Sequence, residues 1–314
     1  MVYRPHIDGL RALAVLGVVI HHAFPLLLPG GFIGVDIFFV ISGYLISHIL
    51  MQEGRASHLD LARFYLRRIR RLLPALILVL LACMVYGWWA LLADEYQQLA
   101  KHAVGAGLFI VNLMLLGEAG YFDVSSQLKP LLHLWSLSVE EQFYFVWPFV
   151  LLWCLGSRRS LSMHIWSILL GSFVLCLYFS LTESAYAFYL PFTRFWELAA
   201  GDLLALWHLE HCERFEPTTN PILFIVGLLL VLVPMFFINK HFVWPGLWAT
   251  LPVLGALCLI HAGTVNATSR QWLAHSWMVW FGLISYPLYL WHWPILTFAR
   301  IERGVDFPHF WHWV

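Results

Sequence analysis

Long apolar runs separated by short polar segments make up most of the chain. The first two runs, Leu10–Leu28 and Phe32–Ile49, are joined by a Pro-Gly-Gly sequence at 29–31. A helix needs about 20 residues to cross a bilayer, and a Pro-Gly-Gly sequence is typical of a turn. The pattern therefore predicts a transmembrane helical hairpin at the start of the chain.

The same pattern continues to the end and predicts an all-α, polytopic membrane protein, a bundle of about ten transmembrane helices. The further expected spans are Leu72–Ala93, His102–Leu116, a span ending near Trp153, Met163–Leu181, Tyr189–His208, Ile222–Ile238, Phe242–His261 and Trp277–Ile301. Composition supports this class, because 61% of the residues are hydrophobic and 11% are charged, against about 45–50% and 25% in soluble domains. The formal net charge is zero, so we expect no nucleic-acid partner, and the five cysteines lack metal-ligand spacing, so we expect no metal.

The segment Gln52–Arg71 is the most charged part of the chain and carries six arginines. By the positive-inside rule this segment is cytoplasmic, which puts the N-terminus in the cytoplasm and the turn at 29–31 outside. Ten alternating crossings then place Arg158 and Arg159 outside, although the same rule favours the cytoplasm for them. Either the short fourth span is not a full crossing, or this arginine pair departs from the rule.

Four ionisable residues, Arg11, His21, His22 and Asp36, fall in or beside the first two apolar runs. An ionisable group in hydrocarbon costs a few kcal/mol, so it usually faces a bundle interior, a partner or water. The eleven-residue step from Arg11 to His22 is about 1100° of helix, which places both on one face, about 16 Å apart. His21 points about 100° away, and Asp36 should lie at a depth similar to that of His22, where its carboxylate could orient the imidazole.

Each of these residues also has a simpler interpretation. Arg11 can extend to the headgroups and anchor the helix, and a single intramembrane histidine is often a hydrogen bond between helices. A carboxylate at the depth of Asp36 requires a partner in either case. The shared face of Arg11 and His22 favours a path from one membrane surface to a reaction centre.

A second basic site follows the hairpin, where Arg68 and Arg71 lie three residues apart on one helical face. Guanidinium groups suit phosphates, so these two and Arg11 could form a cationic patch at the cytoplasmic mouth. The alternative is an ordinary positive-inside anchor.

The later spans add further candidates. Glu140, with Glu141 beside it, stands at the mouth of a span, where carboxylates can also simply suit a helix N-terminus. Arg194 and Glu197 are spaced to pair along one helix, as a structural or gating pair in a segment that also holds Asp202. The last span carries Tyr286, Tyr289 and His292, which can alternatively belong to an interfacial aromatic belt.

Six stretches, taken in order, resemble the acyltransferase-3 family of bacterial membrane O-acyltransferases, which act on O-antigen and other surface polysaccharides. They are YRPHIDGLRALAVL, GGFIGVDIFFVISGYLI, FYLRRIRRLLPAL, LLHLWSLSVEEQFYFVWP, TRFWELAAG and SYPLYLWHWP. The resemblance covers nearly the whole chain. It implies a ten-helix core that moves an acyl group, usually acetyl from cytoplasmic acetyl-CoA, to a hydroxyl of a glycan or lipid-linked glycan outside.

The resemblance also implies roles for individual residues. Arg11 and His22 match the family's basic-x10-His motif, with His22 the catalytic candidate, assisted by Asp36 and Glu140. Arg68 and Arg71 match its RxxR motif, which together with Arg11 suits the phosphates of CoA. Apart from the resemblance, we expect a supporting role toward the substrates for Tyr286, Tyr289, His292, Arg194 and Glu197. The general-base role and the covalent-carrier role of His22 both stay open.

We expect residues 1–301 to form the transmembrane domain and 302–314 a short tail, in the bacterial cytoplasmic (inner) membrane, with the lipid bilayer as a partner. Many relatives with this opening continue into an extracytoplasmic SGNH domain, and this chain ends at Val314 without one. It is then either a stand-alone transferase, which a separate SGNH-type or other extracytoplasmic partner could serve, or a fragment. The alternative function is a proton-coupled transporter or flippase, since intramembrane Arg, His and Asp also mark such relays; a third is an inactive scaffold.

Overall fold

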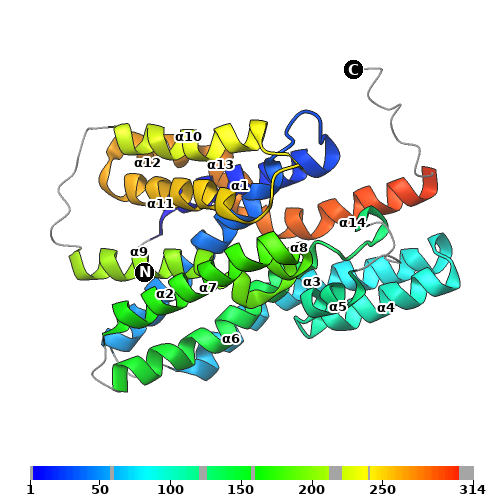
Figure 1. The fold of residues 1–314 in the computed structure, drawn as a ribbon, viewed down its shortest axis with the longest axis horizontal. Coiled ribbons are helices and arrows are strands. Elements are labelled where there is room, and N and C mark those ends of the chain that lie inside the picture. The colour runs from blue at the N-terminus through cyan, green and yellow to red at the C-terminus, as the bar shows by residue number, and fades with distance from the viewer. Residues whose placement is uncertain are drawn as a thin grey trace. The chain divides into compact units, whose positions relative to one another are not determined.

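The computed structural model of the chain is built from helices. It describes residues 3–56, 60–119, 126–156, 160–211, 221–239 and 241–303. Within these residues every regular element is a helix and no strand occurs (Figure 1). The predicted all-α class is confirmed. The chain divides into two compact units, Met1–Leu61 with Glu140–Ser285 and Ala62–Val139 with Tyr286–Val314.

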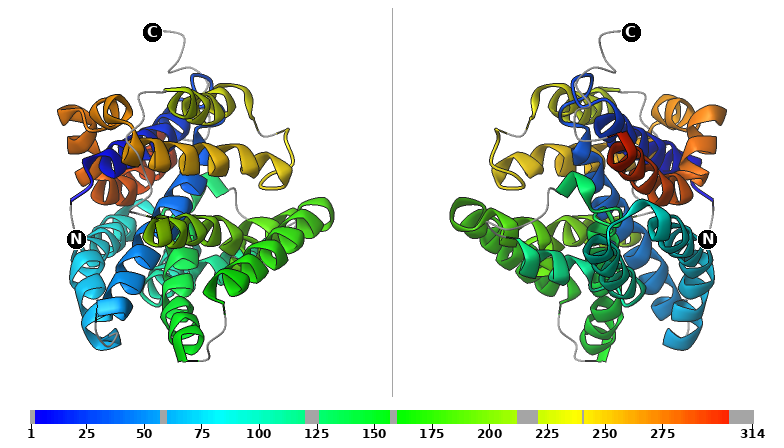
Figure 2. Two further views of the ribbon diagram at one scale, coloured as in Figure 1. Left: turned by 90° about the vertical axis from the view of Figure 1, so that its left-hand side faces the viewer. Right: turned by 90° about the vertical axis from the view of Figure 1, so that its right-hand side faces the viewer.

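The first unit holds most of the helices. They are α1 (Pro5–Ala23), α2 (Gly34–Ala56), the larger part of α6 (Leu134–Gly156), α7 (Leu161–Thr182), α8 (Ser184–Tyr189), α9 (Phe195–His211), α10 (Ile222–Phe237), α11 (Thr250–Val265), α12 (Ala267–Leu273) and α13 (Ser276–Leu283). Helices α10 and α11 lie side by side (Figure 1). Helix α1 packs against α12 and α13, which both views of Figure 2 show.

Helices α2 and α9 pack closely because glycines line their crossing. A Cβ atom on Gly43 would lie 2.0 Å from the backbone oxygen of Leu198, and one on Gly201 would lie 2.2 Å from that of Val40. Small residues allow helix backbones to approach this closely in membrane proteins. The crossing brings buried polar side chains of α2 and α9 within hydrogen-bonding distance of each other.

The second unit consists of α3 (Leu61–Ala90), α4 (Ala93–Gly107), α5 (Val111–Glu118), the start of α6 and α14 (Ser285–Arg303). The Tyr286 hydroxyl donates to the Leu72 carbonyl at 3.0 Å, and Tyr86 donates to Glu302. The contacts advance along both helices in the same direction, so α3 and α14 run parallel.

Four helical stretches of the described chain are long and apolar enough to cross a membrane: Gly31–Gly54, Leu61–Ala90, Leu161–Thr182 and Leu247–Val265. The shorter helix Ile222–Phe237 is also apolar. These lengths and compositions are those of a polytopic membrane protein. The count of ten crossings stays a prediction.

Several expected spans are interrupted, which corrects the prediction from hydropathy. The span His102–Leu116 is wrong as a single helix, because α4 ends at Gly107 and Phe109 has a φ of 56°, a left-handed conformation that does not continue a right-handed helix. Both explanations of the arginine conflict stay open, and Arg158 and Arg159 lie outside the described residues.

Two other predicted spans are also broken, and one begins late. The span Tyr189–His208 is divided by a 3₁₀ turn at Pro191–Thr193 before α9 begins. The span Trp277–Ile301 is two helices, since α13 ends at Leu283 and α14 begins at Ser285. Helix α11 begins at Thr250 rather than at Phe242. Apolar runs are continuous in sequence across these points, so hydropathy does not detect the turns.

Candidate active site

Helix α1 carries the first pair of predicted site residues. It runs without interruption from Pro5 to Ala23, so the helical geometry that places Arg11 and His22 on one face applies along its whole length. Arg11 is half-buried and lies 3.6 Å from the carboxylate of Asp8. His22 is half-buried in the last turn of the helix.

The neighbouring His21 has the orienting contact that was expected for His22. Its Nδ1 lies 3.0 Å from the backbone carbonyl of Leu28. A carbonyl only accepts, so Nδ1 carries the proton and Nε2 of the neutral ring is the basic nitrogen. The rings of His21 and His22 are 5.1 Å apart. Helical periodicity could not reveal this contact, because Leu28 belongs to the turn after α1.

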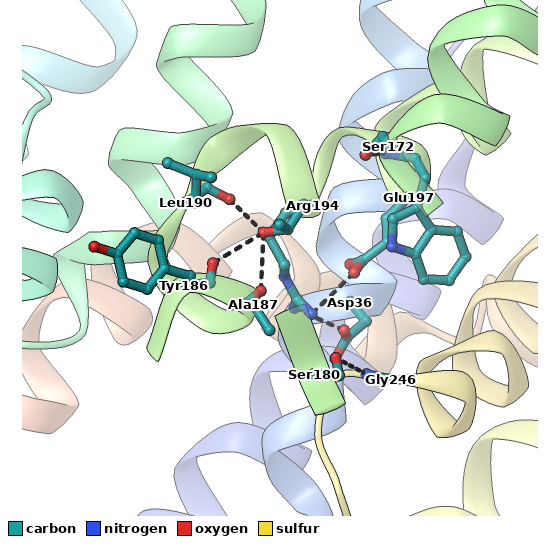
Figure 3. A network of polar contacts seen from close by, with 11 residues as sticks. Asp36, Ser172, Ser180, Tyr186, Ala187, Leu190, Arg194, Glu197 and Gly246 are labelled. Carbon is teal, nitrogen blue, oxygen red and sulfur yellow. Dashed lines mark hydrogen bonds and ion pairs between the residues drawn. The ribbon is translucent and has the colours of Figure 1, made fainter. Parts of the chain in front are cut away.

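Asp36 does not orient His22, which corrects that prediction. Its Oδ1 accepts a hydrogen bond from Arg194 at 2.8 Å, and the structure gives Asp36 no hydrogen bond to His22. Figure 3 shows Asp36 and Glu197 both directed at the Arg194 guanidinium. The physical reason is charge: a buried carboxylate is best compensated by a guanidinium, which offers a full charge and several donors.

Arg194 and Glu197 form the predicted ion pair, at 3.0 Å, and this prediction is confirmed. Both side chains and that of Asp36 are at most 1% exposed. Arg194 is positioned by the 3₁₀ turn that precedes α9, where the Thr193 hydroxyl donates to the Leu190 carbonyl at 2.6 Å. The cluster joins α2 to α9 and has the character of a structural ion pair.

Glu140 is held by two hydroxyl groups that sequence analysis did not find. Its Oε1 accepts from the Ser42 hydroxyl at 2.7 Å and from the Tyr144 hydroxyl at 2.8 Å. Tyr144 follows Glu140 by one helical turn, so that contact was within reach of a spacing argument. Ser42 lies on α2, and only tertiary packing brings it to α6. The two donors hold the carboxylate in one orientation. A carboxylate that binds a substrate or accepts a proton needs such a fixed orientation.

A further buried carboxylate, Asp202, lies in the same unit. The Ser47 hydroxyl donates to Asp202 Oδ1 at 2.5 Å, and the indole nitrogen of Trp147 donates to Ser47 at 2.5 Å. The other Asp202 oxygen has no hydrogen-bond partner among the described residues. The network links α2, α6 and α9.

The remaining predicted residues belong to the second unit. The Tyr289 hydroxyl donates to the His133 carbonyl at 2.6 Å and lies 2.7 Å from the Ser136 hydroxyl. His292 Nδ1 lies 2.6 Å from the Tyr289 carbonyl, and its ring is 5.6 Å from that of His133. The end of α14 near Tyr289 is therefore a polar cluster and not merely an aromatic belt.

Arg68 and Arg71 both lie on α3, Arg68 half-buried and Arg71 exposed. Their spacing on one helix is as predicted, and their proposed role toward phosphates stays a prediction. The cationic patch with Arg11 also stays a prediction, because Arg11 belongs to the first unit.

One charged cluster of the second unit was not expected. The Glu118 carboxylate accepts from Lys129 Nζ and lies against His102 Nε2, both at 2.8 Å. Glu118 ends α5, outside the apolar runs, and its side chain is 26% exposed. Burial opposes its ionisation, but the hydrogen bonds from Lys129 and His102, and their charges, outweigh burial and hold the pKa of Glu118 below its ordinary value.

Comparisons with known proteins identify the family. A family model described as an acyltransferase domain matches residues 4–306. The chain is 34% identical over 330 aligned positions to "Putative peptidoglycan O-acetyltransferase YrhL" of Bacillus subtilis, covering 99% of this chain and 51% of the relative. It is 32% identical over 323 positions to "Peptidoglycan O-acetyltransferase OatA" of Listeria monocytogenes, covering 98% and 52%.

The chain thus spans about half the length of these curated relatives. No solved structure matches it. The matched range, residues 4–306, contains all the candidate site residues described above: Arg11, His22, Arg68, Arg71, Glu140, Tyr289 and His292. On this evidence the chain belongs to the acyltransferase-3 family of membrane acyltransferases.

Proposed function

We propose that this protein transfers an acyl group, acetyl in the first instance, from cytoplasmic acetyl-CoA to a hydroxyl of an extracytoplasmic glycan. Two relatives carry names that refer to peptidoglycan O-acetylation. These names support peptidoglycan as the acceptor ahead of O-antigen. The protein would act in the bacterial cytoplasmic membrane with its N-terminus in the cytoplasm, as the arginines of Gln52–Arg71 favour.

The observation that carries the proposal is the unbroken helix α1 with Arg11 and His22 on one face, inside a family match over residues 4–306. A sugar hydroxyl is a poor nucleophile at neutral pH and needs a base, and histidine is the commonest one. His22 takes that role, as general base or as covalent carrier. Arg68 and Arg71 suit the phosphates of CoA, because guanidinium groups bind phosphate in bidentate fashion.

Glu140 is the second group of the proposed site. Its carboxylate is oriented by Ser42 and Tyr144, so it can accept a hydrogen bond from a substrate hydroxyl or amide. Asp36 has a different place in the proposal. It supports the site through the Arg194 ion pair and makes no hydrogen bond to His22 in the structure.

The test measures CoA release and acetyl transfer to soluble peptidoglycan fragments, with the purified chain in lipid. His22→Ala should abolish turnover while CoA binding is kept. His21→Ala is the matched control, because it removes the adjacent imidazole and its bond to Leu28. Turnover that survives in His22→Ala and fails in His21→Ala would move the catalytic role to His21.

Two other outcomes separate the alternatives. CoA binding without turnover in the wild type would indicate that a partner or a further domain completes transfer. Absence of CoA binding would refute the transferase proposal.

In that last case the proton-coupled transporter becomes the better hypothesis. The buried carboxylates of Asp36, Glu197 and Asp202 favour it, since such groups mark proton relays in transporters.

A further inference from the structure

A strip of aromatic rings leads from the catalytic candidate His22 to a segment that the proposed chemistry does not use. The His22 ring lies 5.1 Å from that of His21, and the His21 ring lies 5.3 Å from that of Phe32. The Phe32 ring in turn lies 5.0 Å from that of Trp244. All four residues are half-buried. They belong to α1, to the turn that follows it and to the segment between α10 and α11.

The strip lies at the end of the first unit that we expect outside the membrane. The Gly30 N–H donates to the Met235 carbonyl at 2.8 Å, so the turn at 29–31 packs against the end of α10. The positive-inside rule puts this turn outside. Trp244 lies on the same side, because Phe32 directly follows the turn and contacts Trp244. An extracytoplasmic glycan approaches the protein from this side.

The indole nitrogen of Trp244 is a hydrogen-bond donor that the fold leaves unused. Its Nε1 has no hydrogen-bond partner among the described residues, and the atom is accessible rather than buried. Two buried tryptophans differ from it, since Trp147 donates to Ser47 and Trp293 donates to the Lys129 carbonyl. The Trp244 N–H is therefore available to a bound molecule.

The backbone beside Trp244 is held in place from α7. The Gly246 N–H donates to the Ser180 hydroxyl oxygen at 3.0 Å, and the Ala249 N–H donates to the Pro245 carbonyl at 3.0 Å. Pro245 and Gly246 are buried, and Trp244 packs against the core of the first unit. A side chain that is already fixed loses little conformational entropy when a ligand binds.

A fixed, half-buried tryptophan with an accessible N–H suits a sugar. A sugar ring has an apolar face of C–H bonds that packs on an aromatic ring, and hydroxyl groups that accept from an N–H. Tryptophan offers an apolar body and a polar donor in one side chain, and ligand sites combine aromatic walls with a few polar groups that fix orientation. Three ring steps separate Trp244 from His22, so a sugar on Trp244 is not the one that reacts at His22.

We propose that Trp244, with Phe32 beside it, is an acceptor subsite that binds a sugar near the modified one along the glycan chain and so brings the reacting hydroxyl to His22. The inference deepens the proposed function and rests on it, because it takes the acceptor to be a glycan. Trp244 is an acceptor-binding residue and takes no part in bond making. The subsite favours an oligosaccharide over a single sugar.

The test uses the purified full chain in lipid with a soluble peptidoglycan tetrasaccharide as acceptor. Trp244→Ala removes the ring and the donor, whereas Trp244→Phe keeps a ring and removes only the donor. Trp248→Ala is the matched control, because Trp248 lies in the same segment, is 45% exposed and contacts Phe242. Trp248 shares any role of Trp244 in an interfacial aromatic belt, but it is not part of the strip.

A subsite predicts a change in acceptor KM alone. Trp244→Ala should raise the KM for the tetrasaccharide about 5–150-fold, since a ring contact and a hydrogen bond are lost. Trp244→Phe should raise it about 2–13-fold, since only the hydrogen bond is lost. Both kcat and the KM for acetyl-CoA should stay within about threefold of the wild type. Trp248→Ala should match the wild type in all three constants.

An unchanged KM for the tetrasaccharide in Trp244→Ala, or an equal rise in Trp248→Ala, would overturn the subsite. If Trp244→Ala does not fold, Trp244→Phe carries the same test.

Binding of the tetrasaccharide, measured by saturation-transfer NMR, separates this inference from the proposed function. A wild type that binds the sugar without turning over acetyl-CoA, with binding lost in Trp244→Ala, would refute the transferase and support the subsite. A wild type that transfers acetyl, with binding and KM unaffected by Trp244→Ala, would support the transferase and refute the subsite. A wild type that does not bind the tetrasaccharide would also refute the subsite.

Discussion

Replacing Arg194 with methionine tests whether the buried ion cluster supports the fold. The substitution keeps an apolar stem of similar length and removes the guanidinium. Asp36, 2.8 Å away, and Glu197, 3.0 Å away, would then be buried without their cation. A buried charge left without its partner is far more costly than the intact pair is stabilising.

The magnitude follows from which charges remain. Removing one partner of a buried ion pair costs about 3–5 kcal/mol, and Arg194→Met leaves two uncompensated carboxylates, so we expect the upper part of that range. Asp36→Asn leaves the Arg194–Glu197 pair with balanced charge. It should cost about 1–3 kcal/mol, the usual loss for a buried hydrogen bond to a charged group.

The assay is unfolding by SDS in mixed micelles, followed by tryptophan fluorescence, for each single variant and for the double variant. Arg194→Met combined with Asp36→Asn should be less destabilising than the sum of the single changes, because the second change removes one of the stranded carboxylates. An Arg194→Met variant no less stable than Asp36→Asn, or strictly additive effects, would refute the argument.

Three further predictions concern other parts of the chain. Glu118→Gln should lower the free energy of unfolding by about 1–3 kcal/mol at pH 7. The folded pKa of Glu118 lies below its ordinary value of 4.5, so the free energies of unfolding of wild type and variant should converge as pH falls below that value. A difference in stability that does not depend on pH would contradict the ion cluster. Gly201→Ala should destabilise the protein by about 1–3 kcal/mol, since its Cβ would lie 2.2 Å from the backbone oxygen of Val40. Gly171→Ala is the control and should not destabilise it, because nothing lies within 4 Å of that Cβ. Equal melting temperatures of the two variants would count against close packing of α2 and α9. Arg68→Ala with Arg71→Ala should weaken CoA binding most at low salt, where charge contacts are least screened, and an unchanged CoA affinity in a salt titration would return both arginines to the role of membrane anchors.

Tertiary structure decided where the helices stop and which polar groups meet. The apolar runs 102–116 and 277–301 are continuous in hydropathy, yet the chain turns at Phe109 and between Leu283 and Ser285. Hydropathy measures the preference for lipid over water, and it contains no information about a single backbone torsion. For the same reason the number of apolar runs is an imperfect guide to the number of helices.

The sequence by itself determined the helical class, the membrane as solvent and the family, because these depend on composition, on periodicity and on motifs in order. It also determined contacts within one helix, such as Arg194 with Glu197, since a helix fixes which neighbours share a face. It did not determine that Asp36 binds Arg194, that Ser42 holds Glu140, or that Tyr44 reaches His208. Those contacts join residues 98 to 164 positions apart, and they depend on which helix packs against which, a choice that no local pattern encodes.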